Sequence, residues 1–303
     1  MTTFTTTQIP DMTGRTVIVT GANSGIGRAA ATALAAKGAR VVVAVRNVDK
    51  GNTAAAQMPG TAEVRRLDLA SLASINEFAR EWDGAIDLLI NNAGIMVPPL
   101  SRTADGFELQ FGTNHLGHFA LTNLLLQHIT GRIVTVSSTG HWIGTIDFAD
   151  LNWEHKPYKA WRAYGQSKLA NLLFTAELQR RLTEVGSTVT ANAAHPGYAA
   201  TNLQFHSGRR VVDLISMVGN RLIAQDEAGG ALPTLYAAVA AIPGNSFAGP
   251  GGFGQQQGAP KLVARSGAAR DMDVARRLWD VSEQLTEVTF PLTRSSSEAA
   301  LRP

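Results

Sequence analysis

The sequence predicts one α/β domain with a doubly wound, mostly parallel, seven-stranded sheet and helices on both faces. Short runs rich in β-branched residues alternate with segments of helical periodicity, as in βαβ units. The central runs are continuously apolar, which indicates strands buried on both faces. A chain of 303 residues, 45% of them apolar, can form one such domain. The expected strands are 16–20, 40–45, 63–67, 86–90, 132–136, 188–194 and 261–263.

The composition excludes several classes of function. The chain has no cysteine, which rules out disulfides and thiolate metal sites and fits a cytoplasmic protein. The net charge of +3 is small and scattered, so we expect no nucleic-acid surface. No apolar run reaches the roughly 18 residues of a membrane span. His115 and His118 lack a third ligand at metal-site spacing, so we interpret both as structural and expect no metal.

The ends of the chain differ in composition from its middle. Residues 1–12 are Thr-rich without signal-peptide features and predict a flexible leader, and residues 293–303 predict a disordered tail. Residues 13–292 would form the catalytic domain. Within it, residues 198–225 mix apolar and basic side chains and predict a lid over a substrate pocket, with a plain surface loop as the alternative.

The first strand leads through a glycine turn into an alanine-rich helix over 28–37, which Gly38 ends. The glycines fall at positions 21, 25 and 27, so the turn is not the general G-x-G-x-x-G. Turn amides and the positive end of the helix dipole favour a pyrophosphate, and glycine lets the backbone approach it. The alternative is a turn that only connects strand to helix.

The second strand, 40–45, ends at Arg46 and Asn47. An acidic residue there would bind the ribose hydroxyls of NAD, whereas a guanidinium binds a 2′-phosphate. This position therefore favours NADP over NAD, although Arg46 could also be an ordinary surface arginine.

Later strands also end in small or polar residues. Strand 63–67 ends at Asp68 and Leu69, and Ser71 is the expected N-cap of an amphipathic helix over 71–80. Strand 86–90 leads into Asn91-Asn92-Ala93-Gly94, whose small residues let a ligand approach the carboxyl edge of the sheet.

The next segments carry the polar residues of a candidate active site. Asn114 lies inside the helical pattern 107–129, where an amide competes with backbone hydrogen bonds. Ser138 follows strand 132–136. Tyr164 and Lys168 stand four residues apart, on one face of a helix that runs from 163 to 184.

Strand 188–194 leads into His195-Pro196-Gly197 and then Thr201. A helix is expected over 226–241, then the last strand and a helix over 271–285.

Together these motifs, in this order, resemble the short-chain dehydrogenase/reductase family and imply its Rossmann fold. The resemblance implies that Tyr164 is the proton donor, Lys168 binds the ribose and lowers the tyrosine pKa, Ser138 binds the substrate oxygen and Asn114 holds a relay water. The implied cofactor-binding residues are Gly21, Asn23, Ser24, Gly25, Ile26, Gly27, Arg46, Asn47, Asp68, Leu69, Asn92, Ala93, Gly94, Tyr164, Lys168, Pro196, Gly197 and Thr201.

The resemblance is closest to the retinol dehydrogenase, WW-domain oxidoreductase and protochlorophyllide reductase branch. It rests on Asn114-His-Leu-Gly-His-Phe, on Tyr164-Gly-Gln-Ser-Lys and on the 26 positions between Ser138 and Tyr164. This sequence departs from the branch because it lacks a WW module and the membrane anchor of the vertebrate retinol enzymes. These departures imply a soluble enzyme and leave its substrate unnamed.

The sequence thus predicts an NADP-dependent oxidoreductase that transfers a hydride between nicotinamide and an apolar carbonyl or alcohol substrate. Six apolar side chains could line its pocket or belong to the core, namely Trp142, Ile143, Trp153, Phe205, Ile215 and Met217. A regulatory protein that binds NADP without turnover and an epimerase or dehydratase of the same superfamily are the alternatives. The helices at Phe107 and Tyr164 are the candidate contacts of a homo-oligomer.

Overall fold

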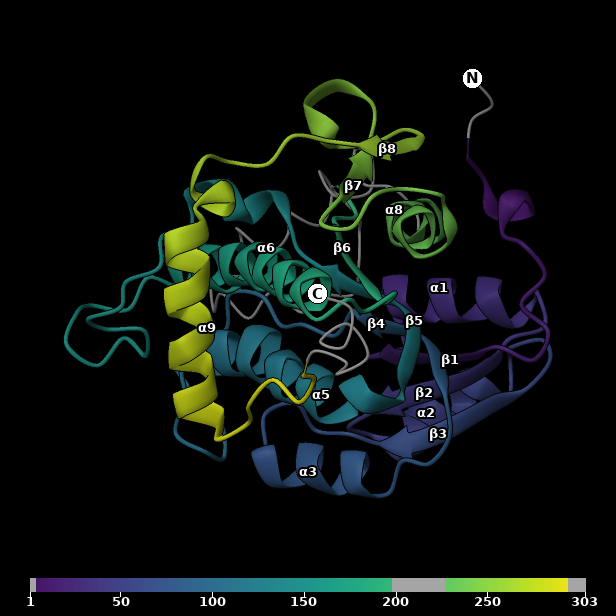
Figure 1. The fold of residues 1–303 in the computed structure, drawn as a ribbon, viewed down its shortest axis with the longest axis horizontal. Helices are drawn as coiled ribbons and strands as arrows, with labels where there is room; N and C mark the ends of the chain where they lie inside the picture. Colours follow the sequence, from purple (N-terminus) through teal and green to yellow (C-terminus); the bar gives the residue numbers. More distant parts are fainter. Residues whose placement is uncertain (1–3, 198–226, 294–303) are drawn as a thin grey trace, which may run out of the picture.

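The computed structural model describes residues 4–197 and 227–293. It confirms a doubly wound Rossmann fold whose mostly parallel sheet is covered by helices on both faces (Figure 1). The strands are β1 Thr16–Thr20, β2 Arg40–Val45, β3 Ala62–Arg66, β4 Ile86–Asn91, β5 Ile129–Val136, β6 Thr190–Ala194, β7 Phe247–Pro250 and β8 Pro260–Leu262. The sheet therefore has eight strands and not seven. Strand β7 was missed because it spans only four residues and ends in Gly249 and Pro250, which are typical of turns.

The strand order is β3-β2-β1-β4-β5-β6-β7-β8. Neighbouring strands are parallel from β3 to β7, and only the pair of β7 and β8 is antiparallel. The chain direction across the sheet reverses between β1 and β4. Ligands of such sheets bind at the carboxyl ends of the strands beside this switch point. The loops after β1, β4, β5 and β6 all meet at this edge.

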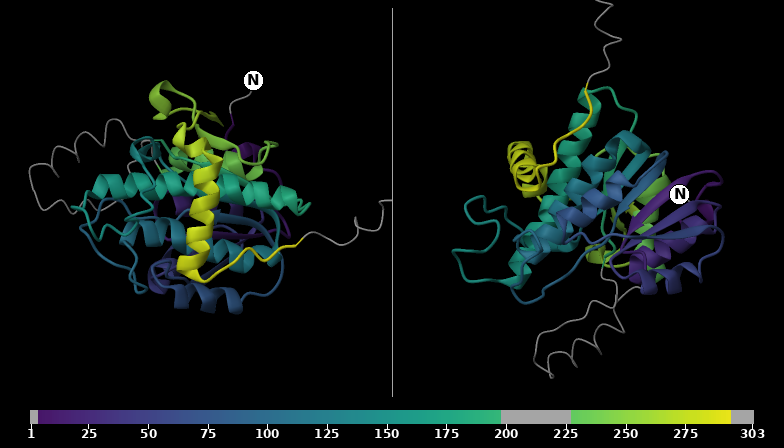
Figure 2. Two further views of the ribbon diagram at one scale, coloured as in Figure 1. Left: turned by 60° about the vertical axis from the view of Figure 1, so that its left-hand side comes forward. Right: turned by 90° about the horizontal axis from the view of Figure 1, so that it is seen from below.

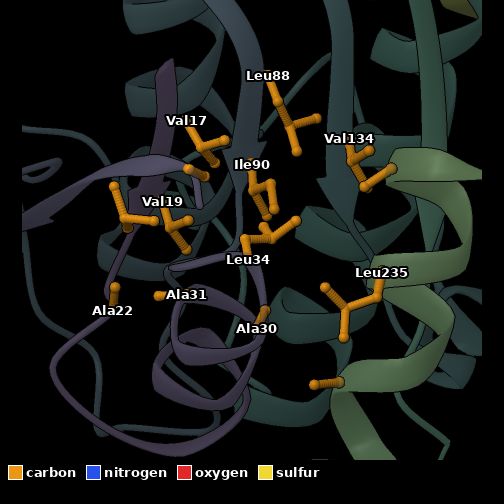
Figure 3. Packing of buried hydrophobic residues seen from close by; sticks show 14 of the residues in the cluster. Val17, Val19, Ala22, Ala30, Ala31, Leu34, Leu88, Ile90, Val134 and Leu235 are labelled. Carbon is orange, nitrogen blue, oxygen red and sulfur yellow. The ribbon is translucent and has the colours of Figure 1, made fainter. Parts of the chain in front are cut away.

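One face of the sheet is covered by α1 Gly25–Ala35, α2 Val48–Ala55 and α8 Glu227–Val239. Small residues of α1, such as Ala30 and Ala31, let this helix approach Val17 and Val19 of β1 closely, and Leu235 of α8 joins the same cluster (Figure 3). Close packing here holds the N-terminus of α1 at the end of β1, where the glycine turn lies.

The other face is covered by α3 Leu72–Arg80, α5 Gly117–Leu125 and α6 Ala160–Glu184. Ser71 N-caps α3 as expected, because its side chain accepts a hydrogen bond from the Ser74 amide. Helix α9, Met272–Thr286, lies outside this layer and crosses α5 and α6 (Figures 1 and 2). None of the helices in the described part of the chain is long and apolar enough to cross a membrane.

The segment before α5 is not the continuous helix that its periodicity predicts. A short α4, Leu109–Phe111, passes into a π-helical turn over Gly112–Leu116 before α5 begins. Asn114 lies in this π-helical turn. Such turns interrupt the regular ladder and are frequent at functional sites.

The shorter one-turn helices are η1 Thr6–Gln8, η3 Leu126–His128, η4 Thr139–Ile143, η5 Phe253–Gln255 and η6 Ala268–Arg270. Residues 4–12 differ from the flexible leader that their composition predicts. Phe4, Ile9 and Met12 are buried, and the Phe4 ring packs edge-on against Tyr236 of α8 at 5.3 Å. Three apolar side chains scattered among threonines give no periodic signal, so only the tertiary contact reveals them. The expected lid at 198–225 and the tail from 294 lie outside the described residues.

Candidate active site

The glycine turn after β1 has the conformation that an anion site needs. Gly21 and Gly25 have positive φ angles of 69° and 59°, which other residues adopt only with strain. Ser24 occupies the N-cap of α1 but makes no side-chain capping bond within the described structure. The amides of the first helical turn, around Ile26 and Gly27, therefore remain as donors for an anion. This turn fits a dinucleotide pyrophosphate.

The turn is joined directly to the loop after β4. The Thr20 hydroxyl accepts hydrogen bonds from the amides of Asn92 and Ala93, both at 2.9 Å. The Asn92 side chain donates in return to the Thr20 carbonyl at 2.8 Å. A Cβ at Gly21 would lie only 3.0 Å from Ala93, so glycine is required where the two loops touch.

The ends of β2 and β3 present the expected polar residues beside this turn. Arg46 is exposed at the end of β2, and the Asn47 side chain N-caps α2 by accepting from the Lys50 amide at 2.9 Å. Asp68 is half-buried after β3, and its carboxylate accepts from the Ala70 amide at 3.0 Å, while Leu69 is buried.

Ser138, Tyr164 and Lys168 come together at the carboxyl end of β5. The Ser138 side chain lies close enough to the Tyr164 hydroxyl to lower its pKa, and Ser138 Oγ accepts from the Gly140 amide at 3.0 Å. Lys168 Nζ lies 5.8 Å from the centre of the Tyr164 ring and donates to the Val136 carbonyl at 3.2 Å. Gly140 is a residue that the sequence interpretation missed, and a Cβ there would press on the Tyr164 ring at 2.9 Å.

Burial dominates the electrostatics of these side chains. It raises the pKa of Tyr164 above its ordinary value, and the hydrogen bond with Ser138 acts in the opposite direction. Burial also lowers the pKa of Lys168 to about 8. Both groups are thus shifted toward their neutral forms in the protein alone.

Asn114 is held on both sides of its amide. Its Oδ1 accepts from the Ile95 amide at 2.8 Å, and its Nδ2 donates to the Ile95 carbonyl and to Ser167 Oγ, both at 3.0 Å. A Cβ at Gly94 would lie 3.2 Å from Asn114 Oδ1 and 3.3 Å from Lys168 Nζ. Asn114 and Lys168 therefore flank Gly94, which is exposed at the edge of the sheet.

The loop after β6 completes this edge. Gly197 has a φ of 73°, and its amide donates to His195 Nδ1 at 3.1 Å, next to Pro196. A Cβ at Gly197 would clash with the Gln256 carbonyl, so this loop packs against the segment after β7. Thr201 lies outside the described residues.

A cavity of about 500 Å³ lies between the one-turn helix after Ser138 and the segment 251–264, and Ser138, Tyr164 and Lys168 are not part of its lining. Its lining includes Thr139, Trp142, Lys261, Leu262 and Val263. The Trp142 side chain is 54% exposed.

Other apolar pocket candidates have different surroundings. Ile143 is 47% exposed on the same one-turn helix as Trp142. Trp153 is buried against Tyr158 and Lys156 inside the 144–159 segment, so it belongs to the packing of that segment. Phe205, Ile215 and Met217 lie outside the described residues.

Glu108 and Gln110 are two buried polar residues outside every sequence motif, and their hydrogen bonds hold the segments that surround the site. Glu108 caps α4 through the amides of Gln110 and Phe111, and it accepts from the Tyr158 hydroxyl at 2.9 Å. Gln110 accepts from the Val97 amide and donates to the Ala160 carbonyl, which ties the loop after β4 to the start of α6. Glutamate is not a preferred N-cap residue, so the sequence offered no signal for either side chain.

Comparison with known proteins agrees with this geometry. Residues 15–210 match the model of the short chain dehydrogenase family. Human retinol dehydrogenase 13 is 44% identical over 300 residues, which cover 93% of this chain and 87% of that protein.

Solved structures agree with the family match. The crystal structure of an uncharacterized protein from Mycobacterium paratuberculosis is 52% identical, covers 96% of this chain and all of that chain, and has a TM-score of 0.86. A structure from Beutenbergia cavernae, assigned to an NAD(P)-dependent gluconate 5-dehydrogenase and containing NADP, is 28% identical with a TM-score of 0.58. That match covers 76% of this chain and 91% of that one.

Proposed function

Because the chain belongs to the short-chain dehydrogenase family, we propose that it is an NADP-dependent oxidoreductase acting on an apolar carbonyl or alcohol substrate. The observation that carries the proposal is the convergence of Ser138, Tyr164 and Lys168 at the carboxyl end of β5, the neighbour of β4 in the sheet. A protein that only sensed the dinucleotide would have no need of this constellation.

The loops at the carboxyl edge would hold the dinucleotide. Amides of the Gly21–Gly27 turn would bind its pyrophosphate, and Asp68 and Asn92 would lie on the adenosine side. Lys168 and the Pro196-Gly197 loop would contact the nicotinamide half. When bound, the cofactor supplies or accepts the hydride at the substrate carbon.

The protein's own residues would donate the proton to the substrate and replace it afterwards. In reduction, the Tyr164 hydroxyl donates its proton to the substrate oxygen as negative charge develops there. Ser138 donates a hydrogen bond to the same oxygen and orients it. The Lys168 ammonium stabilises the phenolate that forms, and Asn114 would hold the water through which the proton is replaced.

Arg46 supports the choice of NADP. Its guanidinium is exposed at the end of β2, where an acidic residue would bind the ribose of NAD. A 2′-phosphate there would form bidentate, charge-assisted hydrogen bonds with this side chain.

The cavity that begins at Thr139, the residue after Ser138, supports an apolar substrate. Trp142, Leu262 and Val263 present apolar surface in its lining. Lys261 is a charged side chain in this lining, and it would face a polar end of an otherwise apolar molecule.

The test is NADPH oxidation, with NADH in parallel, against a panel of apolar aldehydes, ketones and quinones. We expect turnover that prefers NADPH and falls by at least about 100-fold in Tyr164→Phe, which loses the proton donor and keeps the ring. Tight NADPH binding without turnover of any panel member would support the regulatory alternative. Equal rates for Tyr164→Phe and the parent chain would contradict the tyrosine mechanism.

A further inference from the structure

His118 connects the dinucleotide turn with the π-helical turn that carries Asn114. Its Nε2 lies 2.9 Å from Thr20 Oγ1, and its Nδ1 lies 3.0 Å from the Asn114 carbonyl oxygen. All three residues are at most 1% exposed. Thr20 and His118 are 98 positions apart in the sequence, so the contact is purely tertiary.

The surroundings determine which nitrogen of His118 carries the proton. Thr20 Oγ1 already accepts two amide hydrogens, from Asn92 and Ala93, so its own hydrogen is the one that it donates. His118 Nε2, at 2.9 Å, is a nearer acceptor for that hydrogen than the Ile90 carbonyl at 3.4 Å. The Asn114 carbonyl can only accept. A hydrogen on Nδ1 satisfies Asn114, and an unprotonated Nε2 accepts from Thr20. The opposite tautomer would place two acceptors face to face at Asn114.

A neutral imidazole is also what the environment of His118 favours. Complete burial lowers its pKa to about 4, and the nearby positive charge of Lys168 acts in the same direction. Only the hydrogen bond to Asn114 acts against this shift. At neutral pH the ring therefore carries one hydrogen and can take part in one directed chain of hydrogen bonds.

We propose that His118 is a positioning residue that joins the cofactor turn at Thr20 to Asn114 through a directed chain of hydrogen bonds, and its catalytic consequence rests on the proposed function. The chain runs from the amides of Asn92 and Ala93 through Thr20 and His118 to the Asn114 carbonyl. It aligns two loops that would hold the cofactor with the residue that would hold the relay water.

The two hydrogen bonds of His118, to Thr20 and to Asn114, have different consequences. At Thr20, His118 would keep the glycine turn and the loop after β4 in register, which acts on cofactor affinity. At Asn114, it would hold the backbone of the π-helical turn beside Gly94 and Lys168, which acts on the rate of proton transfer. Variants that keep one of these hydrogen bonds and lose the other can therefore separate the effect on cofactor affinity from the effect on proton transfer.

Three substitutions at His118 make this separation. His118→Asn places an amide nitrogen near the position of Nδ1, so it keeps the bond to Asn114 and loses Thr20. His118→Gln reaches the position of Nε2, so it keeps Thr20 and loses Asn114. His118→Phe loses both. The matched control is His115→Phe, because His115 is equally buried, lies three residues before His118 and bonds Ser282 of α9 instead.

We expect a Kd for NADPH raised about tenfold in His118→Asn with kcat nearly unchanged, and kcat lowered about tenfold in His118→Gln with Kd nearly unchanged. His118→Phe should show both changes. His115→Phe should keep both constants within about twofold, even where its Tm falls. Changes below twofold in all His118 variants, or Kd and kcat changes that merely follow Tm, would overturn the proposal.

The nitrogen-15 NMR spectrum of the histidine rings gives a readout that needs no turnover. In the full chain without substrate, we expect the His118 signals, assigned by their loss in His118→Gln, to show a protonated Nδ1 and an unprotonated Nε2 between pH 6 and 8. A protonated Nε2 would overturn the proposal. If the chain turned over no substrate, the proposed function would fail, while the NMR spectrum and the NADPH Kd values would still decide the role of His118.

Discussion

At the scale of single residues, burial shifts the pKa values of Tyr164 and Lys168 in opposite directions. It raises the pKa of Tyr164, so the hydroxyl keeps the proton that reduction requires. It lowers the pKa of Lys168 to about 8, so the ammonium that would stabilise the phenolate is lost in mild alkali. The upper pH limit of reduction should therefore be set by the lysine.

Replacing Lys168 by arginine tests this assignment. Lys168 is charged below about pH 8, so the kcat for reduction in the parent chain should decline as the pH rises through that value. Arginine stays protonated, so in Lys168→Arg the decline should move to higher pH, with a lower maximum because the guanidinium is larger. The measurement is kcat against pH with saturating NADPH. An unmoved alkaline limb would assign the decline to another group.

Arg46 should determine the choice between the two dinucleotides. In Arg46→Ser, the KM for NADPH should rise about 10- to 100-fold, because a charge-assisted bidentate contact with phosphate is lost. The KM for NADH should stay within about twofold. Arg80→Ser is the matched control, since Arg80 is an exposed arginine at the end of α3. An equal rise for both cofactors would show that Arg46 supports the loop and does not recognise phosphate.

At the scale of elements, helix α9 packs on α5 and α6, the helices that the sequence analysis proposed as contacts between subunits. Its Trp279 packs edge-on against Phe119 of α5 at 4.9 Å and stacks on Phe174 of α6 at 5.8 Å. The Arg181 guanidinium lies over the Trp279 ring, 4.6 Å from its centre. Because α9 covers this face of both helices, a pairing of subunits through α5 and α6 would have to use another face.

Truncation of this tryptophan should destabilise the fold strongly. Trp279→Ala should lower the free energy of unfolding by about 3–5 kcal/mol, because it leaves a cavity among aromatic rings that are themselves buried. Phe253→Ala is the control and should change it by less than about 0.5 kcal/mol, since that ring is fully exposed. Urea unfolding of the three proteins provides the comparison. Similar midpoints for both variants would mean that α9 is only loosely docked.

At the scale of the whole molecule, burial lowers the pKa of four histidines of the described residues, namely His115, His118, His141 and His195. Burial lowers the pKa of His115 to about 3 and those of His118 and His195 to about 4. Unfolded histidine has a pKa near 6.5 and binds a proton below it. On acidification the unfolded chain therefore takes up protons that the native chain does not, and acid favours unfolding.

The free energy of unfolding should accordingly fall as the pH drops from about 6.5 toward 4. His115, His118 and His195 each contribute a slope of about 1.4 kcal/mol per pH unit in that window, and His141 acts in the same direction. His115→Phe should reduce the total slope by about that amount, whatever its effect on stability at pH 7. Urea titrations at several pH values measure it. An unchanged slope in the variant would mean that His115 is already protonated in the native chain.

The sequence by itself determined the fold class, most of the strands and helices, though not β7 or α2, and the edge of the sheet where the proposed site residues lie. Strands that carry continuous apolar runs must be buried, and their carboxyl ends must meet at one edge of a parallel sheet. Glycine, asparagine and serine residues placed directly after those strands therefore indicate a common site. Gly21, Asn92 and Ser138 could be assigned to that edge without coordinates, because local backbone chemistry and strand polarity are sufficient.

The tertiary structure alone decided which remote groups meet behind that edge. Hydrophobic periodicity predicts that a residue is buried. It does not predict which residue it contacts, because hydrogen-bond and packing partners are distant in sequence. From the sequence, His118 is indistinguishable from any other core histidine. Only the structure shows that its two ring nitrogens form hydrogen bonds with Thr20 and Asn114. The short strand β7 and the burial of Phe4 were hidden for the same physical reason, since each is stabilised by contacts with distant segments and not by a local pattern.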